Sequence, residues 1–157
     1  MLPRWQVLRA ALDIYVRSGW MICYSEFLGV LAEGVAGRGE LPDATAMIQE
    51  ALEWSNRTGE QYYAAELLRI KGEISLRKAD EQSVETAEGC FREALDVASR
   101  QGALMWELRA ATSLARLRIR QDRRDDARRV LAPVHARFTE GFETADLCAA
   151  RELLEIL

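Results

Sequence analysis

Histidine and cysteine, the residues that most often supply a nucleophile, a base or a zinc ligand, are few in this sequence and far apart. His135 is the only histidine, so a histidine-based triad, dyad or zinc site has no second imidazole to use. Cys23, Cys90 and Cys148 are widely spaced in apolar helical contexts. This pattern predicts buried thiols, and neither a disulfide framework nor a Cys-x-x-Cys site. We therefore expect no catalytic centre, no metal and no cofactor.

Two stretches could bind phosphate. Gly37 and Gly39 form a Gly-Arg-Gly run, but a nucleotide-binding loop needs a preceding strand and a further glycine; the run therefore predicts a turn. Residues 116–129 hold seven arginines against three aspartates, with no interleaved aromatic residue to stack on bases. Because the net charge is −4, we expect this stretch to be a solvated turn with ion pairs, and nucleic acid to be an unlikely partner.

A third set of polar residues recurs at fixed distances from Ala32, Gly72 and Ala115, the small residues expected inside the first helix of three helix pairs. Polar residues stand mainly six residues before, three before and one after these positions. Such ladders along a groove suit recognition of an extended peptide or a partner helix, and nearby aromatic residues could anchor it. The predicted partner-binding groove comprises Tyr24, Glu26, Tyr62, Tyr63, Glu66, Arg69, Glu73, Trp106, Arg109 and Arg116. The alternative is that the charges are only solvated and the aromatic rings pack between repeats.

The elements that would position these residues are helices. In residues 83–101, Ala87, Phe91 and Ala94 fall on one helical face, with small residues that let a neighbouring helix approach and a bulky ring between them. The same pattern recurs at Ala44, Ile48 and Ala51. Helical periodicity predicts helices at 4–18, 20–36, 43–57, 61–78, 83–101, 104–120, 125–138 and 145–156, the last with Thr144 as N-cap. No strand-like alternation competes.

Gly19, Gly59, Gly102 and Gly141 are expected to end helices, and they are 40, 43 and 39 residues apart. This period predicts an all-α fold: a right-handed α-α superhelix, or solenoid, of antiparallel helix pairs with about eight helices. We expect one domain over 1–157, with a half repeat at 4–18, repeats at about 20–58, 60–101 and 103–140, and a C-terminal capping helix at 144–157. The half repeat looks like the second helix of a pair whose first helix is missing, either because the chain continues upstream or because it serves as a cap.

The spacing of 12 from Ala32 to Ala44, with a bulky residue four further on and a small one three later, resembles the tetratricopeptide repeat. The longer period is similar to the tetratricopeptide variants of large bacterial signalling ATPases. Residues 108–154, especially the stretches RAATSLARL and FTEGFETADL, resemble the C-terminal region of bacterial proteins that join an adenylate/guanylate cyclase or a winged-helix regulator to an AAA-type ATPase. No GxxxxGK[ST] loop occurs, so the catalytic parts of such proteins do not carry over.

The resulting hypothesis is a non-catalytic protein-interaction or regulatory module, acting as the sensor or scaffold tail of such a signalling ATPase or cyclase. Its partner would be a protein, a peptide or another domain of the same polypeptide. One alternative is a small-ligand sensor with a pocket between helices. Another is self-association into a homodimer, because the apolar face of residues 5–15 lacks a mate. No apolar run approaches the roughly 20 residues that span a bilayer, so we expect a cytoplasmic protein without a membrane partner.

Overall fold

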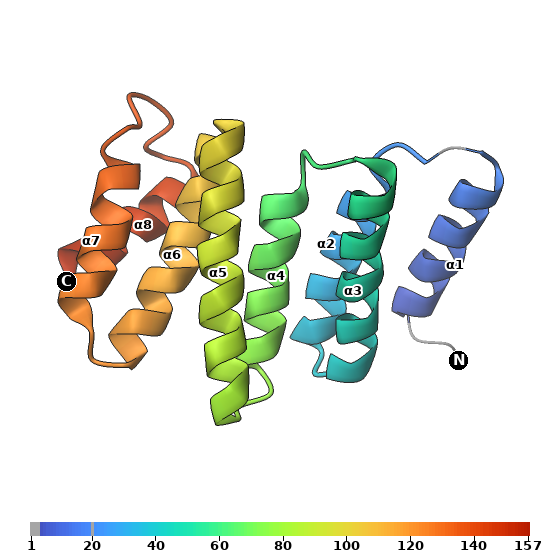
Figure 1. Cartoon of the computed structure of the whole chain (residues 1–157), viewed down its shortest axis with the longest axis horizontal. Helices are drawn as coiled ribbons and strands as arrows, with labels where there is room; N and C mark the ends of the chain where they lie inside the picture. The colour runs from blue at the N-terminus through green and yellow to red at the C-terminus, as the bar shows by residue number, and fades with distance from the viewer. Residues whose placement is uncertain (1–3, 20) are drawn as a thin grey trace.

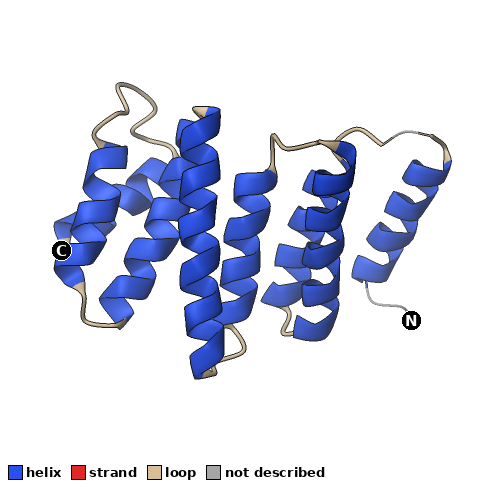
Figure 2. Cartoon of the chain, in the orientation of Figure 1, coloured by secondary structure: helices blue, strands red, loops and turns tan. Residues whose placement is uncertain are grey.

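The computed structural model describes residues 4–19 and 21–157. Within these ranges the chain forms helices, turns and loops, and no strand (Figure 2). The eight helices are α1 (Arg4–Arg17), α2 (Tyr24–Gly37), α3 (Leu41–Thr58), α4 (Ala64–Leu76), α5 (Glu81–Gln101), α6 (Leu104–Arg120), α7 (Arg124–His135) and α8 (Ala145–Glu155). The prediction of an all-α chain with about eight helices is confirmed.

The helices follow one another in chain order along the molecule, from α1 at one end to α7 and α8 at the other (Figure 1). In the described part, every contact between helices joins helices one or two places apart in the chain. Close backbone approaches between helices two places apart involve only α2, α4, α6 and α8, which therefore form one layer, the inner layer. Short loops at 38–40, 77–80 and 121–123 connect the antiparallel pairs α2–α3, α4–α5 and α6–α7. The right-handed superhelix, or solenoid, stays a prediction.

Alternation of small and bulky residues explains how these pairs pack. On α5, Ala87, Phe91 and Ala94 are completely buried. The Phe91 ring lies directly on Gly72 of α4, where an added Cβ would come within 2.5 to 3.0 Å of three ring atoms. A glycine on one helix thus makes the room that a phenylalanine on the next one fills, as the pattern predicted.

Five helices (α2, α3, α4, α5 and α7) begin one to four residues away from the predicted start, and two of these differences have a clear local cause. The helix expected from 83 begins at Glu81, because the Asp80 carboxylate accepts a hydrogen bond from the Ser83 backbone N–H at 2.7 Å and caps the first turn. The helix expected from 20 begins at Tyr24. Cys23 before it has a left-handed φ of 62°, which an α-helix does not accommodate, and position 20 lies outside the described residues.

Three of the four predicted stop glycines follow helices, and the fourth does not. Gly59 and Gly102 adopt left-handed C-cap conformations after α3 and α5, and Gly19 has a φ of 86° just after α1. Gly141 lies in the loop between α7 and α8, because α7 ends at His135 instead of residue 138. Its carbonyl accepts a hydrogen bond from the Thr144 N–H at 2.9 Å, so it forms the turn into α8. No helix in the described ranges has the length and apolar character to cross a bilayer.

Candidate functional site

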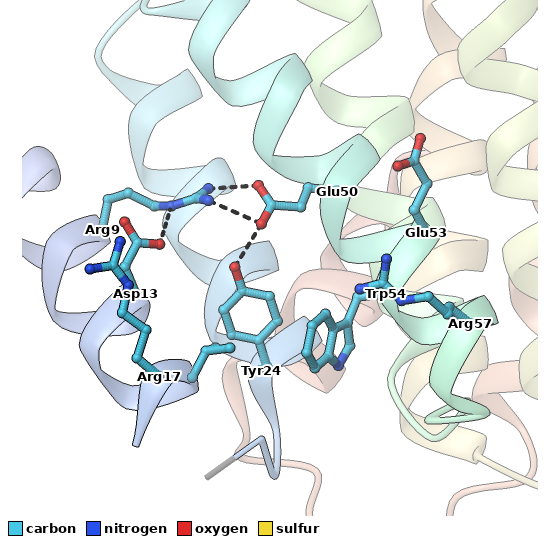
Figure 3. Close-up of a pocket in the computed structure, with 9 residues that line it drawn as sticks. Arg9, Asp13, Arg17, Tyr24, Glu50, Glu53, Trp54 and Arg57 are labelled. Atoms are coloured by element: carbon cyan, nitrogen blue, oxygen red, sulfur yellow. Dashed lines mark hydrogen bonds and ion pairs between the residues drawn. The ribbon is translucent and has the colours of Figure 1, made fainter. Parts of the chain in front are cut away.

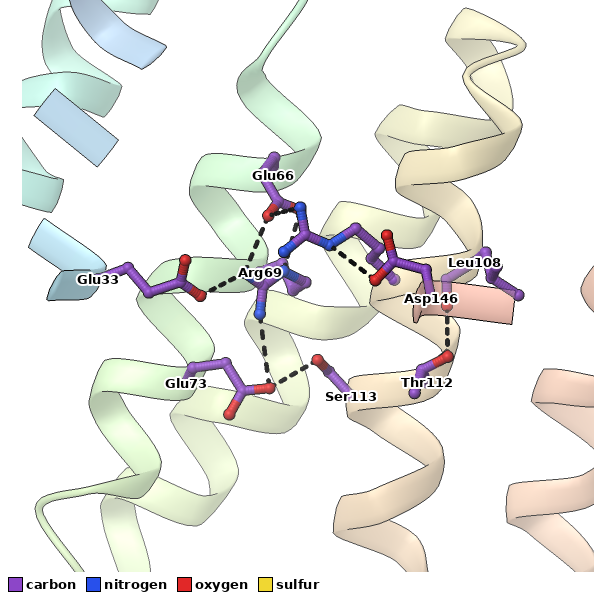
Figure 4. A network of polar contacts seen from close by, with 9 residues as sticks. Glu33, Glu66, Arg69, Glu73, Leu108, Thr112, Ser113 and Asp146 are labelled. Atoms are coloured by element: carbon purple, nitrogen blue, oxygen red, sulfur yellow. Dashed lines mark hydrogen bonds and ion pairs between the residues drawn. The ribbon is translucent and has the colours of Figure 1, made fainter. Parts of the chain in front are cut away.

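The predicted groove charges meet on the inner layer (Figure 4). Arg69 on α4 donates hydrogen bonds to both carboxylate oxygens of Glu66, each at 2.9 Å, and to Glu33 on α2 at 2.7 Å. Arg109 on α6 lies 2.7 Å from the same Glu66 carboxylate. Glu66 therefore pairs with two arginines, one on its own helix and one on the next helix of the layer.

Further ion pairs extend this cluster to α8. Glu73 lies 3.7 Å from Arg69 and accepts a hydrogen bond from the Ser113 hydroxyl at 2.6 Å. Asp146, on α8, lies 3.6 Å from Arg109. We call this set of residues the inner-layer network, and it connects α2, α4, α6 and α8.

The charges of the inner-layer network compensate one another. Glu66 is only 1% exposed, and burial raises the pKa of its carboxyl, although Arg69 and Arg109 act in the opposite direction. For Arg69, burial lowers the pKa, but the Glu66 and Glu33 carboxylates raise it by more. Arg116 is exposed and makes no ion pair with the described residues. The network thus has the geometry of a structural tie between helices, with Arg116 as the free charge beside it.

The predicted aromatic anchors pack mainly between neighbouring repeats. The buried ring of Tyr63 meets Trp106 edge to face, with centroids 5.3 Å apart, and the Arg109 guanidinium lies 5.7 Å from the Trp106 ring centroid. Burial and the nearby Glu66 and Glu26 carboxylates raise the pKa of Tyr63 to about 12. The exposed Tyr62 donates a hydrogen bond to Glu26 at 2.8 Å.

Tyr24 lies apart from the other predicted residues, in a polar pocket of about 410 Å³ where α1, α2 and α3 meet (Figure 3). Its hydroxyl donates to Glu50 on α3 at 2.7 Å, and its ring packs on Trp54 at 4.7 Å between centroids. Arg9 of α1 donates two hydrogen bonds to the Glu50 carboxylate, at 2.8 and 3.0 Å. These contacts, with a hydrogen bond from the Trp5 indole to Glu40, hold α1 against α2 and α3.

On its other side, α1 forms an apolar groove with α2, which we call the N-terminal groove. It encloses about 750 Å³ and is lined by Leu8, Ala11, Leu12, Tyr15, Glu26, Phe27, Val30, Leu31 and Gly34. Phe27 and Val30 remain 46% and 54% exposed. Among the predicted site residues only Glu26 lies here. The groove itself was not predicted as a site, although the unmatched apolar face of residues 5–15 was the signal for it.

The first wall of the N-terminal groove can be compared with the inner repeats. Leu8 precedes Ile48 by 40 residues, the same step that separates the first two stop glycines, and it corresponds to Phe91 and Leu131 in the later pairs. These three residues are 0 to 2% exposed, each packed against the first helix of its own pair, whereas Leu8 is 58% exposed. Leu8 therefore occupies a position that a preceding helix buries in every other repeat.

The second wall gives the same result. Phe27 and Val30 on α2 correspond, 40 residues on, to Leu67 and Ile70 on α4. Leu67 and Ile70 are fully buried and pack on α2 at Gly29, where an added Cβ would lie 2.5 Å from Leu67 and 3.7 Å from Ile70. Elsewhere in this fold, the surfaces equivalent to both walls of the N-terminal groove pack against the first helix of a pair. In the N-terminal groove no described helix occupies this position.

The opposite end of the stack is polar by contrast. On α8 the exposed side chains include Arg151, Glu152 and Glu155, which is typical of a capping helix that faces water. The two ends therefore differ: one is closed by charged residues and the other presents an apolar groove.

The remaining candidates from the sequence carry no site geometry. In residues 116–129, Asp126 pairs with Arg123 at 2.7 Å and also with Arg129, as predicted. The turn itself is limited to 121–123, since the rest belongs to α6 and α7, and Arg118 is buried instead of solvated. His135 is half-buried beside Phe142, with ring centroids 6.4 Å apart. All three thiols are free, but only Cys90 is buried; the prediction of buried thiols was wrong for Cys23 and Cys148, which are half-buried. In the described ranges no group of three or more His, Cys, Asp or Glu side chains could hold a metal ion.

Comparison of the chain with protein-family models and with curated proteins finds no match to either.

Proposed function

We propose that this protein is a non-catalytic protein-interaction module that docks an α-helix in its N-terminal groove. The supporting observation is the exposure of Leu8, Phe27 and Val30 at positions whose equivalents one repeat along are buried by a neighbouring helix. A helix lying in this groove would cover apolar surface on both walls, which is the main driving force of helix-in-groove recognition. This moves the expected docking surface from the inner-layer charges to the end of the stack.

A peptide with the sequence of residues 24–37 is a suitable probe, because α2 itself occupies the equivalent seat one repeat along. A labelled version should bind the full chain, as measured by fluorescence anisotropy. Val30→Glu should weaken binding at least ~10-fold, since burying an unpaired charge costs more than the 1.4 kcal/mol that corresponds to a factor of ten. Ile156→Glu, at an exposed apolar position near the polar end, is the matched control protein.

Leu28→Glu in the peptide supplies a second control, because Leu28 is completely buried where α2 sits in the fold. Absence of binding to the unmodified chain, at a concentration where sedimentation shows it to be monomeric, would refute the proposal. Equal binding to the Val30→Glu and Ile156→Glu proteins would refute it as well, since the peptide would then be attached elsewhere.

A small-ligand sensor is the second candidate function, and the pocket around Tyr24 and Trp54 favours it. Its volume of about 410 Å³ lies within the usual range of about 300–1,000 Å³ for ligand sites. The Arg57 guanidinium lies 5.0 Å from the Trp54 ring centroid. A thermal-shift screen of metabolites tests this function. A specific ligand at 100 times its Kd raises the free energy of unfolding by about 2.7 kcal/mol, and Trp54→Ala should abolish the resulting shift in Tm.

The cellular location and the parent protein of this chain also belong to the proposal. A cytoplasmic location and a role as the tail of a bacterial signalling ATPase or cyclase rest on the absence of apolar runs in the sequence and on the resemblance given above. Sequencing the gene on both sides of the coding region for this chain would test the second point, because the ATPase or cyclase should lie upstream in the same reading frame.

A further inference from the structure

Beside the N-terminal groove, α1 presents an apolar ridge to solvent. Val7, Ala10, Ala11 and Ile14 follow the i, i+3, i+4, i+7 spacing of one helical face. All four are exposed, with Val7 at 61% and Ile14 at 68%. A convex ridge and a concave groove thus lie side by side at the same end of the molecule, which is the arrangement that a self-complementary two-fold contact requires.

The order of residues along the ridge is symmetric about its centre. The two bulky residues, Val7 and Ile14, are at its ends, and the two small ones, Ala10 and Ala11, are in the middle. If a second α1 packs antiparallel across a two-fold axis, Val7 of one copy meets Ile14 of the other, and the alanines meet at the crossing. Small residues at the crossing allow close approach of the two helices, and bulky ones on either side fill the space.

The apolar surface at this end is large enough for a stable contact. Of the eleven large apolar side chains exposed in the described residues, seven lie between positions 7 and 30. Each is 46 to 68% exposed, and at roughly 100 Å² of apolar surface for a whole side chain of this size they present on the order of 400 Å². A stable complex buries about 800 Å² on each partner, of which a little over half is apolar.

We infer that the occupant of the N-terminal groove is a second copy of this chain. The two open ends face each other across a two-fold axis, with the two α1 ridges packed antiparallel on each other, so that each copy's α1 also covers the edge of the other copy's groove at Ala11, which belongs to both surfaces. This inference rests on the proposed function of the groove as a docking site. The assembly closes at two copies, because a two-fold contact uses the same surface of each copy once; the α8 end carries the exposed charges Arg151, Glu152 and Glu155.

Analytical ultracentrifugation of the full chain over a range of concentrations tests the inference. We expect a reversible change from 17.8 kDa to twice that mass. Ile14→Glu should raise the dimer dissociation constant at least ~10-fold, since the two-fold axis places the buried charge in the contact twice. Ile156→Glu should leave the constant unchanged. Circular dichroism should show native helicity in both, because both side chains are exposed.

Cysteine crosslinking gives an independent measurement. In a Cys23→Ser, Cys148→Ser background, Ala10→Cys should form a covalent dimer under mild oxidation, whereas Ala145→Cys, exposed at the start of α8, should not. A dimer that Ile14→Glu leaves intact and Ala10→Cys fails to trap overturns the inference. A chain that stays monomeric yet binds the peptide 24–37 overturns the inference of a dimer but leaves the proposed docking function intact. A chain that neither dimerises nor binds the peptide refutes both the dimer and the docking function.

Discussion

Replacing Gly72 with alanine tests the packing on which the whole stack depends. The new Cβ would come within 2.5 to 3.0 Å of three Phe91 ring atoms. Phe91 is fully buried, so its ring has no solvent to move into and the α4–α5 pair must separate. Overpacking of this kind lowers the free energy of unfolding by about 1–3 kcal/mol, while the better helix propensity of alanine raises it by about 0.5–1 kcal/mol.

Gly89→Ala is the matched control, because Gly89 lies within α5, is exposed, and has no atom within 4 Å of an added Cβ. It gains the same propensity without the clash, so it should stabilise the protein by about 0.5–1 kcal/mol. The difference between the two variants, about 1–3 kcal/mol, isolates the contact with Phe91. Urea unfolding followed by circular dichroism measures both free energies.

A double-mutant cycle assigns the effect to the ring itself. Phe91→Leu alone should destabilise by opening a cavity, but in the Gly72→Ala background it should cost clearly less, because the smaller side chain relieves the clash. If Gly72→Ala proves as stable as Gly89→Ala, the close approach of α4 and α5 is not a constraint and our account of the stacking fails.

Three further variants probe other parts of the molecule. Arg69→Met should lower the free energy of unfolding by about 3 kcal/mol, because it leaves a buried carboxylate with too few partners, whereas the exposed Arg116→Met should change it little in the same urea titration. Maleimide should label Cys148 well before Cys90 in a mass-spectrometric time course, since Cys90 is covered and burial raises the pKa of its thiol; equal rates would contradict the packing of α5. The hydrogen bonds from Ser83 lower the pKa of Asp80 below its ordinary 3.8 in the folded protein. The Asp80 cap therefore stabilises the folded protein fully above pH 3.8, and this stabilisation is lost as the pH falls through the lower pKa of the folded state. Asp80→Asn should therefore keep the neutral-pH Tm but remove this acid-side loss, and Asp80→Ala should lower Tm already at neutral pH.

Much of the fold follows from local patterns. The alternation of small and bulky residues around Phe91 predicted close packing of a neighbouring helix, and in the structure the ring lies on Gly72 of α4. Gly59 and Gly102 correctly marked helix ends, because a left-handed C-cap favours glycine whatever surrounds it. Gly141 has the same sequence appearance but lies in a loop. Where α7 ends depends on its neighbours, which a spacing rule does not include.

The arrangement of the candidate sites was harder to predict. Spacing placed Glu66, Arg69 and Arg109 on comparable helical faces, but it did not show that the three side chains would turn toward one another and pair. Whether a charge stands free or is paired depends on side-chain conformations across helices that are far apart in sequence. The N-terminal groove follows from a different kind of comparison, in which one repeat lacks a neighbour that the others have.

Contacts limited to helices one or two places apart in the chain also bear on how evolution can change the number of helix pairs. A duplication or deletion of about 40 residues, one helix pair, alters the joints on either side of it and leaves the more distant ones as they were. Evolution can therefore lengthen or shorten the molecule without redesigning its interior. The constraint is the new interface between helices, because a residue such as Arg109, which pairs with Glu66, needs an oppositely charged residue on the new neighbouring helix.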